Sequence, residues 1–415
     1  MSVLYYHRMV EGFPKVLYES VSYAAGYSKR SFVLTTPAGD DHVLIDPSHG
    51  MDLSFPELPL LNEQGLGPRP QNVHVVFFDH EQPWNDNLNR NRSLVDLLRC
   101  CKFTSLYPFT GKSSIVHALA RELSIPVRTA SADTTFWAED KKTLLDFGHL
   151  TDIPAGYKIK DNDDLIHTWR KLIQHESYPG KAVFKASQAA SGVTSTILQS
   201  EEHCRTFINL FNLTDLDGGV LEEWHDSDPR SPSVNYFIYP DGSYKTLFVS
   251  DQIFEKNDTE YGREGTRIYR GNRFPSSFGN DLQEKIVAST KPLLKALYER
   301  GYWGPVGFDT IVFNNNDILV TEINPRITGP HFGWRPMKNL GCTCFSLQNE
   351  AVNKNTSFNS LRTALEDVLF SKQKRQGYII LNFFPGKFIG VVLAAGYDGV
   401  DMIKKKVAER LRPLR

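Results

Sequence analysis

The chain has 415 residues, of which 40% are hydrophobic and 23% are charged, an ordinary composition for a globular protein. Its 47 basic and 48 acidic residues nearly cancel, so the net charge gives no reason to expect binding to nucleic acid or to an anionic membrane. The five cysteines show no zinc-binding spacing, and no apolar run approaches the ~18 residues that span a bilayer. The N-terminus lacks the apolar core of a signal peptide. We therefore expect a cytoplasmic protein with reduced thiols and, at this length, about two to three domains.

Residues 1–130 alternate between short apolar runs and helical spacing, which predicts a small open-sheet α/β domain. The predicted strands cover 31–35, 42–46 and 73–79, and a helix follows at 113–123. The triplet before this helix, Gly111-Lys112-Ser113, resembles part of a phosphate loop. That motif needs a glycine five positions before Gly111, where Leu106 stands, so we interpret Ser113 or Ser114 as a helix cap.

Residues 131–178 form a junction that ends in a helix, which the acidic run 161–164 would cap. Two predicted strands follow, 181–186 and 194–198, joined by a loop of small residues whose backbone N–H groups would be open to an anion. Lys185 lies within the first, otherwise apolar strand. A cation there is costly unless it meets a partner, and a phosphate would serve; the alternative is a lysine that extends to solvent.

A helix is expected at 201–212, and the next predicted strand, 220–224, ends in two carboxylates and a tryptophan. Strands 233–239 and 244–250 are joined by a turn sequence. Residues 251–279 are polar and long for a connector, so we expect a lid, followed by a helix at 281–300. Each arginine of this lid alone is more often solvated, but together they are candidates for contacting an anionic substrate: Arg263, Arg267, Arg270 and Arg273.

The most informative stretch predicts a β-hairpin of residues 307–313 and 318–326 around an Asn- and Asp-rich turn. Asp309 stands near the start of its first strand, and Glu322 and Asn324 near the end of its second. Side chains two apart on a strand share a face, so these three oxygen ligands converge as a predicted Mg²⁺ site. Arg326 would bring a planar cation to the same place.

Beyond this hairpin, residues 328–335 form an aromatic, glycine-containing loop beside the predicted site. His331 is a candidate for catalysis, although packing or substrate shaping is the more frequent role for such a histidine. Arg335 is a further candidate for substrate contact. A helix at 360–370, a hairpin of 378–384 with 388–395, and a basic helix complete a predicted C-terminal α/β extension.

These segments, taken in order, resemble the ATP-grasp superfamily of carboxylate–amine ligases. The resemblance rests on Asp140-Lys141, on Lys185 with its small-residue loop, on the strand ending in Glu222 and Glu223, and on the Asp…Glu-x-Asn hairpin. It implies an α/β protein: an α+β ATP-grasp core, residues 131–345, preceded by the open-sheet domain, residues 1–130, and followed by the extension, residues 346–415.

The resemblance also implies roles for individual residues. Lys141, or its neighbour Lys142, and Lys185 would hold ATP phosphates, and the backbone at Ser191 and Gly192 would close over them. Arg326 would stabilise the transferring phosphoryl group. The remaining implied sets are the adenine pocket, lined by Glu222, Glu223 and Trp224, and the metal ligands Asp309, Glu322 and Asn324 for Mg²⁺ or Mn²⁺.

The implied reaction transfers the γ-phosphoryl group of ATP to a substrate carboxylate, and an amine then displaces phosphate to form an amide or peptide bond. Natural-product ligases that make amides are closest in layout. A carrier-protein thiol as acceptor and a non-catalytic nucleotide-binding protein are the alternatives. The expected partners are a small carboxylate and an amine, with amino acids as candidates, without nucleic acid or membrane, and with a homodimer as the family's frequent state.

Overall fold

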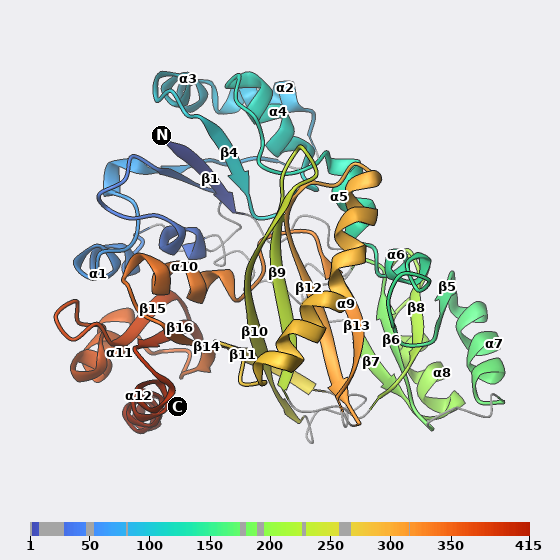
Figure 1. Cartoon of the computed structure of the whole chain (residues 1–415). Coiled ribbons are helices and arrows are strands. Elements are labelled where there is room, and N and C mark those ends of the chain that lie inside the picture. Colours follow the sequence, from blue (N-terminus) through green and yellow to red (C-terminus); the bar gives the residue numbers. More distant parts are fainter. Residues whose placement is uncertain are drawn as a thin grey trace.

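Three sheets and the helices around them make up the described part of the chain in this computed structural model (Figure 1). The first is parallel and the other two are antiparallel, which confirms the predicted fold class of an α+β core preceded by a small open-sheet α/β unit. The described residues are 2–7, 29–46, 54–79, 82–174, 180–188, 195–225, 230–256, 267–314 and 316–415.

The N-terminal unit contains a parallel sheet with the strand order β3-β2-β1-β4. A core of aliphatic and aromatic side chains joins this sheet to its helices, as the alternation of strands and helices predicts. Its strands are β1 (Val3–His7), β2 (His42–Ile45), β3 (Val73–Val75) and β4 (Ser105–Pro108), and its helical segments are α1 (Glu57–Glu63), η3 (Pro70–Asn72), α2 (Trp84–Arg90), α3 (Arg92–Cys100) and α4 (Ser114–Glu122).

One predicted strand of this unit is wrong, because residues 29–34 form a 3-10 helical segment. Phe32, Val33 and Leu34 are all buried, and a short apolar run that is covered on every side does not distinguish a strand from a helical turn. Thr35 closes the segment locally, since its backbone N–H and its hydroxyl both donate to the carbonyl of Phe32.

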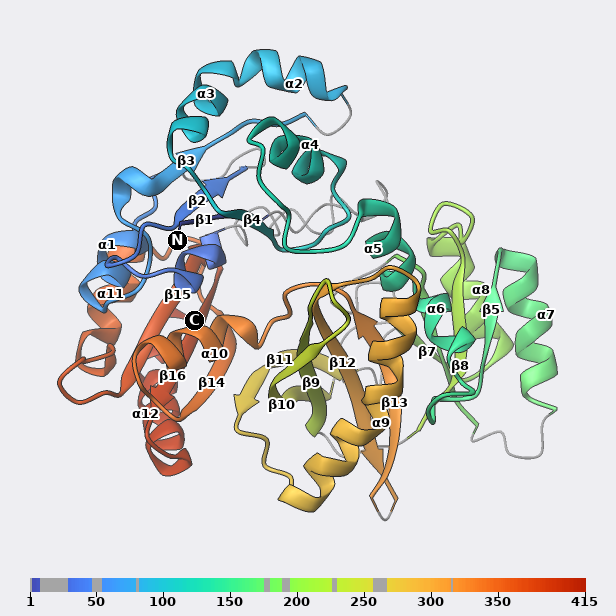
Figure 2. The same ribbon diagram turned by 45° about the horizontal axis from the view of Figure 1, so that its top comes forward.

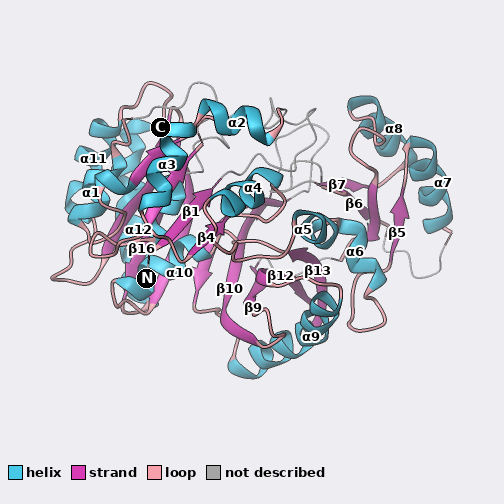
Figure 3. Cartoon of the chain, turned by 90° about the horizontal axis from the view of Figure 1, so that it is seen from above, coloured by secondary structure: helices cyan, strands magenta, loops and turns pink. Residues whose placement is uncertain are grey.

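A small antiparallel sheet with the order β5-β8-β6-β7 lies at the right of the molecule in Figure 1. Helices α7 and α8 cover its outer face, as Figure 3 shows, with Trp169, Phe184 and Phe207 in the shared core. Helix α7 begins where the sequence predicts, because Asp161 accepts a hydrogen bond from the backbone of Asp164. The elements are β5 (Gly156–Ile159), α7 (Asn162–Leu172), β6 (Ala182–Ala186), β7 (Ser195–Leu198), α8 (Glu201–Leu210) and β8 (Gly219–Glu223).

The central eight-stranded antiparallel sheet has the order β13-β12-β9-β10-β11-β14-β16-β15. Helix α9 (Asn280–Glu299) packs on its β9, β12 and β13 end through an apolar core, and it contains Pro292. The strands are β9 (Arg230–Ile238), β10 (Tyr244–Lys256), β11 (Arg267–Phe274), β12 (Gly304–Phe313), β13 (Asp317–Asn324), β14 (Cys344–Ala351), β15 (Gly377–Phe384) and β16 (Lys387–Ala394).

Of the segment predicted as a lid, residues 251–279, most of the described residues belong to this sheet rather than to a loop. Strand β10 runs on to Lys256, and β11 pairs with it antiparallel. Polar side chains are tolerated in these strands because they pair with one another: Ser276 and Ser277, which follow β11, donate to the buried carboxylate of Asp251. Residues 257–266 lie outside the described part.

Strands β14, β15 and β16 continue the central sheet beyond residue 345, so the predicted domain boundary there falls within β14. Helices α11 (Phe358–Leu365) and α12 (Tyr397–Leu411) share a core with β15 and β16, while α1 of the N-terminal unit packs on β15 (Figure 2). The division into three domains stays a prediction. The remaining helical elements are α5 (Ala132–Glu139), α6 (Lys141–Asp146), α10 (His331–Asn339), η4 (Glu366–Val368) and η5 (Arg412–Leu414).

Within the described residues, no helix combines the length and the apolar character that crossing a membrane requires. All five cysteines are free thiols.

Candidate active site

The predicted hairpin is confirmed, and it brings the acidic residues together. Strands β12 and β13 pair antiparallel with Asp309 opposite Glu322 and Gly307 opposite Asn324, and a bulge follows Asp309. Directly opposed residues of an antiparallel pair share a face, so the two carboxylates lie side by side. The first strand begins at Gly304, five residues before Asp309, because the apolar residues before Asp309 pair with β9.

Asp309 is a carboxylate without a cationic partner among the described residues. It accepts hydrogen bonds from the amide of Asn324 at 3.0 Å and from the side chains of Ser233 and Gln252. Burial, together with the charge of Glu322, raises the pKa of Asp309 from 3.8 to about 6. This arrangement is one that an added cation would stabilise.

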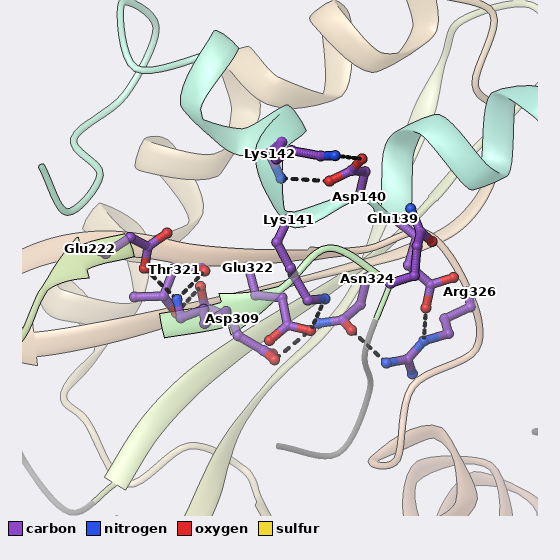
Figure 4. A network of polar contacts seen from close by, with 12 residues as sticks. Glu139, Asp140, Lys141, Lys142, Glu222, Asp309, Thr321, Glu322, Asn324 and Arg326 are labelled. Atoms are coloured by element: carbon purple, nitrogen blue, oxygen red, sulfur yellow. Dashed lines mark hydrogen bonds and ion pairs between the residues drawn. The ribbon is translucent and has the colours of Figure 1, made fainter. Parts of the chain in front are cut away.

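Lys141 supplies the cation next to Glu322. Its ammonium group lies 2.6 Å from Glu322 Oε1, and only 7% of its side chain is exposed (Figure 4). Burial alone would raise the pKa of Glu322, but the charges of Lys141, Arg326 and Lys185 outweigh it and lower that pKa. Lys142 is directed elsewhere, because its ammonium group contacts the backbone and carboxylate of Asp217. Of the two adjacent lysines, the structure therefore brings Lys141 to the acidic hairpin.

Lys185 links the small sheet to the central sheet. From β6, its ammonium group contacts Glu222 Oε2 at 2.6 Å and the carbonyl oxygen of Thr321 at 3.0 Å. Glu222 is 2% exposed, so its ion pair with Lys185 is almost fully buried. Because Thr321 precedes Glu322, Lys185 and Lys141 reach adjacent residues of β13 from different elements. The predicted alternative, a lysine extending into solvent, is not observed.

The predicted adenine residues lie along the end of β8. Glu222 faces Lys185, whereas Glu223 is partly buried with His225 at 3.8 Å. The backbone N–H of Trp224 donates to the carbonyl of Lys181, which holds this end of the strand against β6. Contact of these residues with a base stays a prediction.

Arg326 is held by side chains on two sides. Its Nη2 group donates to Asn324 Oδ1 at 2.7 Å and its Nε–H donates to Glu139 Oε1 at 3.0 Å (Figure 4). The ring of Phe109 lies 5.5 Å from the guanidinium carbon. Arg326 thereby joins the hairpin to the end of α5.

Two charged residues of this network, Glu139 and Lys112, were not predicted as site residues. Glu139 lies in the Glu-Asp-Lys-Lys run of the predicted junction, and Lys112 lies in the Gly-Lys-Ser triplet that predicts a helix start. Their ammonium–carboxylate distance is 2.9 Å, and both side chains are almost fully buried. A cluster of charged residues next to a predicted site lysine was the available signal, but the sequence does not show which of them turn inward.

The predicted substrate residues lie farther along the sheet and helix α10. Arg270 forms an exposed ion pair with Glu255, and Arg335 is exposed on α10. His331 is buried, its Nδ1 accepts from the backbone of Thr328, and burial lowers its pKa to about 4. A neutral, enclosed histidine fits the packing role. Substrate contact by these residues stays a prediction, and the side chain of Arg267 and residues Ser191 and Gly192 lie outside the described part.

The residues at the hairpin fit a divalent cation through their two carboxylates. Nowhere in the described ranges do three or more His, Cys, Asp or Glu side chains gather as metal ligands, so the predicted set depends on the amide of Asn324 as its third member. Asn324 turns its nitrogen to Asp309 and its oxygen to Arg326. Because this oxygen already accepts from Arg326, the oxygen donors that Mg²⁺ prefers are here the two carboxylates, and ligation by Asn324 stays a prediction.

A central antiparallel sheet and a small antiparallel sheet, with lysines from both sides converging on an acidic hairpin, define the class of fold. Residues 168–330 match the family model of the ATP-grasp domain. This part of the chain matches the ATP-grasp domain, and the predicted resemblance is confirmed.

Solved structures share this fold over nearly the whole chain. A carboxyaminoimidazole ribonucleotide synthase from Aspergillus clavatus complexed with ATP has a TM-score of 0.61 and 11% identity, covering 100% of this chain and 99% of its own. A biotin carboxylase from Campylobacter jejuni has a TM-score of 0.59 and 10% identity, covering 99% and 91%. An N5-carboxyaminoimidazole ribonucleotide synthetase from Thermus thermophilus has a TM-score of 0.56 and 14% identity, covering 99% and 99%. At these identities the likeness establishes the fold. No curated protein sequence matches the chain.

Proposed function

We propose that this protein is an ATP-dependent ligase that activates a substrate carboxylate as an acyl phosphate. An amine then attacks the acyl carbon and forms an amide, and ADP and phosphate are released. The observation that carries the proposal is the convergence of Lys141, Lys185 and Arg326 on Glu322, Thr321 and Asn324, at the end of β13 where Glu322 faces Asp309. The ATP-grasp domain match and the ATP complex of the similar synthase support a nucleotide at this place.

Each cation of the site already has an anionic partner. A bound nucleotide could therefore replace these carboxylates as the partner of the lysines. Lys141 pairs with Glu322, Lys185 with Glu222, and Arg326 with Glu139. Phosphate oxygens would take over some of these ammonium contacts at little desolvation cost, because the cations are already held in the enclosed site. Lys141 reaches the site from α6 and Lys185 reaches it from β6, so a phosphate chain would be contacted from two elements.

Asp309 and Glu322 would hold Mg²⁺, which when bound supplies charge neutralisation of the phosphate oxygens during transfer. Arg326 would orient the carboxylate or acyl phosphate through hydrogen bonds. No covalent enzyme intermediate is needed, since phosphoryl transfer of this kind depends on positioning and charge stabilisation.

The test is a screen for phosphate and ADP release with Mg²⁺, ATP and small carboxylic acids, each offered alone, with hydroxylamine, or with candidate amines. Hydroxylamine converts an acyl phosphate to a hydroxamate, so a hydroxamate in proportion to the ADP formed is the expected result. Mass spectrometry of the products then separates an amide from a thioester to a carrier protein.

The Glu322→Ala variant provides the matched test of the site. We expect it to fold and to lose phosphate release, because it removes one of the two facing carboxylates. Asp317→Asn, an exposed change on the same hairpin, should leave turnover intact. Near-normal turnover of Glu322→Ala, or ATP consumption without any hydroxamate, would overturn the proposal.

A further inference from the structure

The N-terminal unit extends a buried lysine into the candidate site. Lys112 lies between β4 and α4, and its ammonium group contacts Glu139 Oε2 at 2.9 Å and Gln188 Oε1 at 3.3 Å. Its side chain is 5% exposed, and it lies 5.6 Å from the ring centre of Phe136. Burying an ammonium group this completely is costly unless a carboxylate pairs with it. Lys112 therefore requires Glu139 as its partner.

Glu139 shares its two carboxylate oxygens between two cations. Oε2 faces Lys112, while Oε1 accepts from the Nε–H of Arg326 at 3.0 Å. The side chain is 6% exposed. Burial would favour its neutral form, but Lys112, Arg326 and Lys141 outweigh burial and lower the pKa of Glu139 to about 2. The carboxylate therefore stays ionised over the whole working range of pH.

The backbone also fixes the two sides of this bridge to one another. Thr110 pairs with Arg326 in an antiparallel bridge, and the N–H of Ile327 donates to the carbonyl of Phe109 at 3.0 Å. These contacts fix the distance between the turn that contains Lys112 and the segment after β13 that contains Arg326. Lys112 and Arg326 meet the same carboxylate because of this docking.

The guanidinium plane of Arg326 is held at two of its corners. Nε–H donates to Glu139 and Nη2 donates to Asn324, which in turn donates to Asp309. A planar fork with two anchored corners has no rotational freedom left. In the described part of the chain, no partner is seen for its third nitrogen, which leaves this corner available to a substrate oxygen.

We propose that Glu139 and Lys112 are positioning residues that hold the guanidinium of Arg326 in its working orientation, and that the N-terminal unit thereby forms part of the catalytic machinery. Glu139 acts on Arg326 through a hydrogen bond, and Lys112 acts on Glu139. The catalytic part of this inference rests on the proposed ligase function, whereas the positioning part depends only on the contacts of Arg326.

The test compares Glu139→Gln and Lys112→Met with the wild-type protein in steady-state phosphate release. Both variants should lower kcat by about 10- to 100-fold, the loss that a small misplacement of a catalytic group produces. KM for ATP should change by no more than about twofold, because Arg326 is not one of the proposed ATP ligands. Lys112→Arg keeps the charge and should recover much of the lost rate.

A matched control separates positioning from plain stability. Lys29 and Glu57 form another buried ion pair, at 3.3 Å, with exposures of 3% and 0%, away from the site. Lys29→Met should lower the unfolding temperature as Lys112→Met does, but leave kcat unchanged. Equal losses of kcat in both variants, or a Glu139→Gln enzyme with wild-type kcat, would overturn the inference.

A second readout needs no turnover. In protein with ¹⁵N-labelled arginine, the Nε–H signal of Arg326, assigned from the Arg326→Lys variant, should be shifted downfield and protected from exchange with water. Glu139→Gln should abolish this protection. Rapid exchange in the wild-type protein would refute the positioning role. If protection is present but no carboxylate supports ATP turnover, the proposed function fails while the positioning of Arg326 stands.

Discussion

Replacing Asp309 by asparagine should make the metal-free protein more stable and inactive at the same time. Asp309 faces Glu322 across the hairpin, and burial together with that neighbour raises its pKa from 3.8 to about 6. Above pH 6 this carboxylate is ionised in the folded protein, and its charge lowers the free energy of unfolding. Between pH 6 and 3.8 folding takes up a proton, so wild-type stability gains as the pH falls through this window.

The pKa difference sets the size of the effect. About two pH units at 1.36 kcal/mol each give roughly 3 kcal/mol as an upper limit on the cost of the charge at pH 8. Asp309 accepts hydrogen bonds from several side chains, and an asparagine that loses one acceptor gives back about 1 kcal/mol. Asp309→Asn should therefore raise the free energy of unfolding by about 1 to 2 kcal/mol at pH 8.

Urea unfolding of both proteins at pH 8 and pH 4, with EDTA and with Mg²⁺, measures this directly. The gain should be present at pH 8 in EDTA and absent at pH 4, where the wild-type carboxylate is protonated. Mg²⁺ should stabilise the wild-type protein and not the variant. Asp317→Asn, on the exposed part of the hairpin, should show neither effect. A variant less stable than wild type at pH 8 in EDTA would refute the reasoning about the facing carboxylates.

Three further outcomes follow from the contacts of single residues. Lys141→Met should weaken ATP binding, measured by calorimetry, by about 10-fold or more, whereas Lys142→Met, whose ammonium group contacts Asp217, should change it little; equal effects would contradict the assignment of Lys141. Burial and the neighbouring His42 lower the pKa of His74 from 6.5 to about 4. As the pH falls from 6.5 to 4, the unfolded chain gains a proton that the folded state excludes, so the free energy of unfolding should fall by about 2 to 3 kcal/mol. His74→Gln should flatten this acid dependence in denaturant titrations. Gly271→Ala should cost more than about 2 kcal/mol in the same assay, because Gly271 has a φ of +150° and its added methyl group would collide with the carbonyl oxygen of Leu347 across β11 and β14; a tolerated alanine would show that these strands can shift apart.

The acidic hairpin could be predicted because its information is local. Asn314 and Asn316 adopt positive φ values in the turn, as asparagine readily does, and the alternation of the flanking strands sets the register that opposes Asp309 to Glu322. Two-residue periodicity and turn chemistry lie within one stretch of sequence. The facing of Asp309 and Glu322 follows from them without knowledge of the rest of the fold.

The segment 251–279 could not be predicted in the same way. Its polar, glycine- and arginine-containing sequence suggests a loop, yet β10 and β11 pair there and lie within the central sheet. The hydrogen bonds that make polar strands tolerable come from residues far away in the chain or from the partner strand, as with Asp251 and Ser276. Strand formation depends on such neighbours, so the residue pattern of the segment alone does not predict these strands.

Lys112 shows the same limit at the site itself. Its glycine-lysine-serine context lacks one glycine of the phosphate-loop spacing and predicts a helix cap instead, and Ser113 caps α4. What the sequence does not contain is the docking of the turn against residues 324–327, which directs the lysine to Glu139 rather than to solvent. A charged residue in a loop acquires a role in the site only when another element supplies its counter-charge, and here that element is a helix further along the chain. The ion pair therefore belongs to the assembled fold, and disrupting it should affect the orientation of Arg326 even though no local motif identifies either partner.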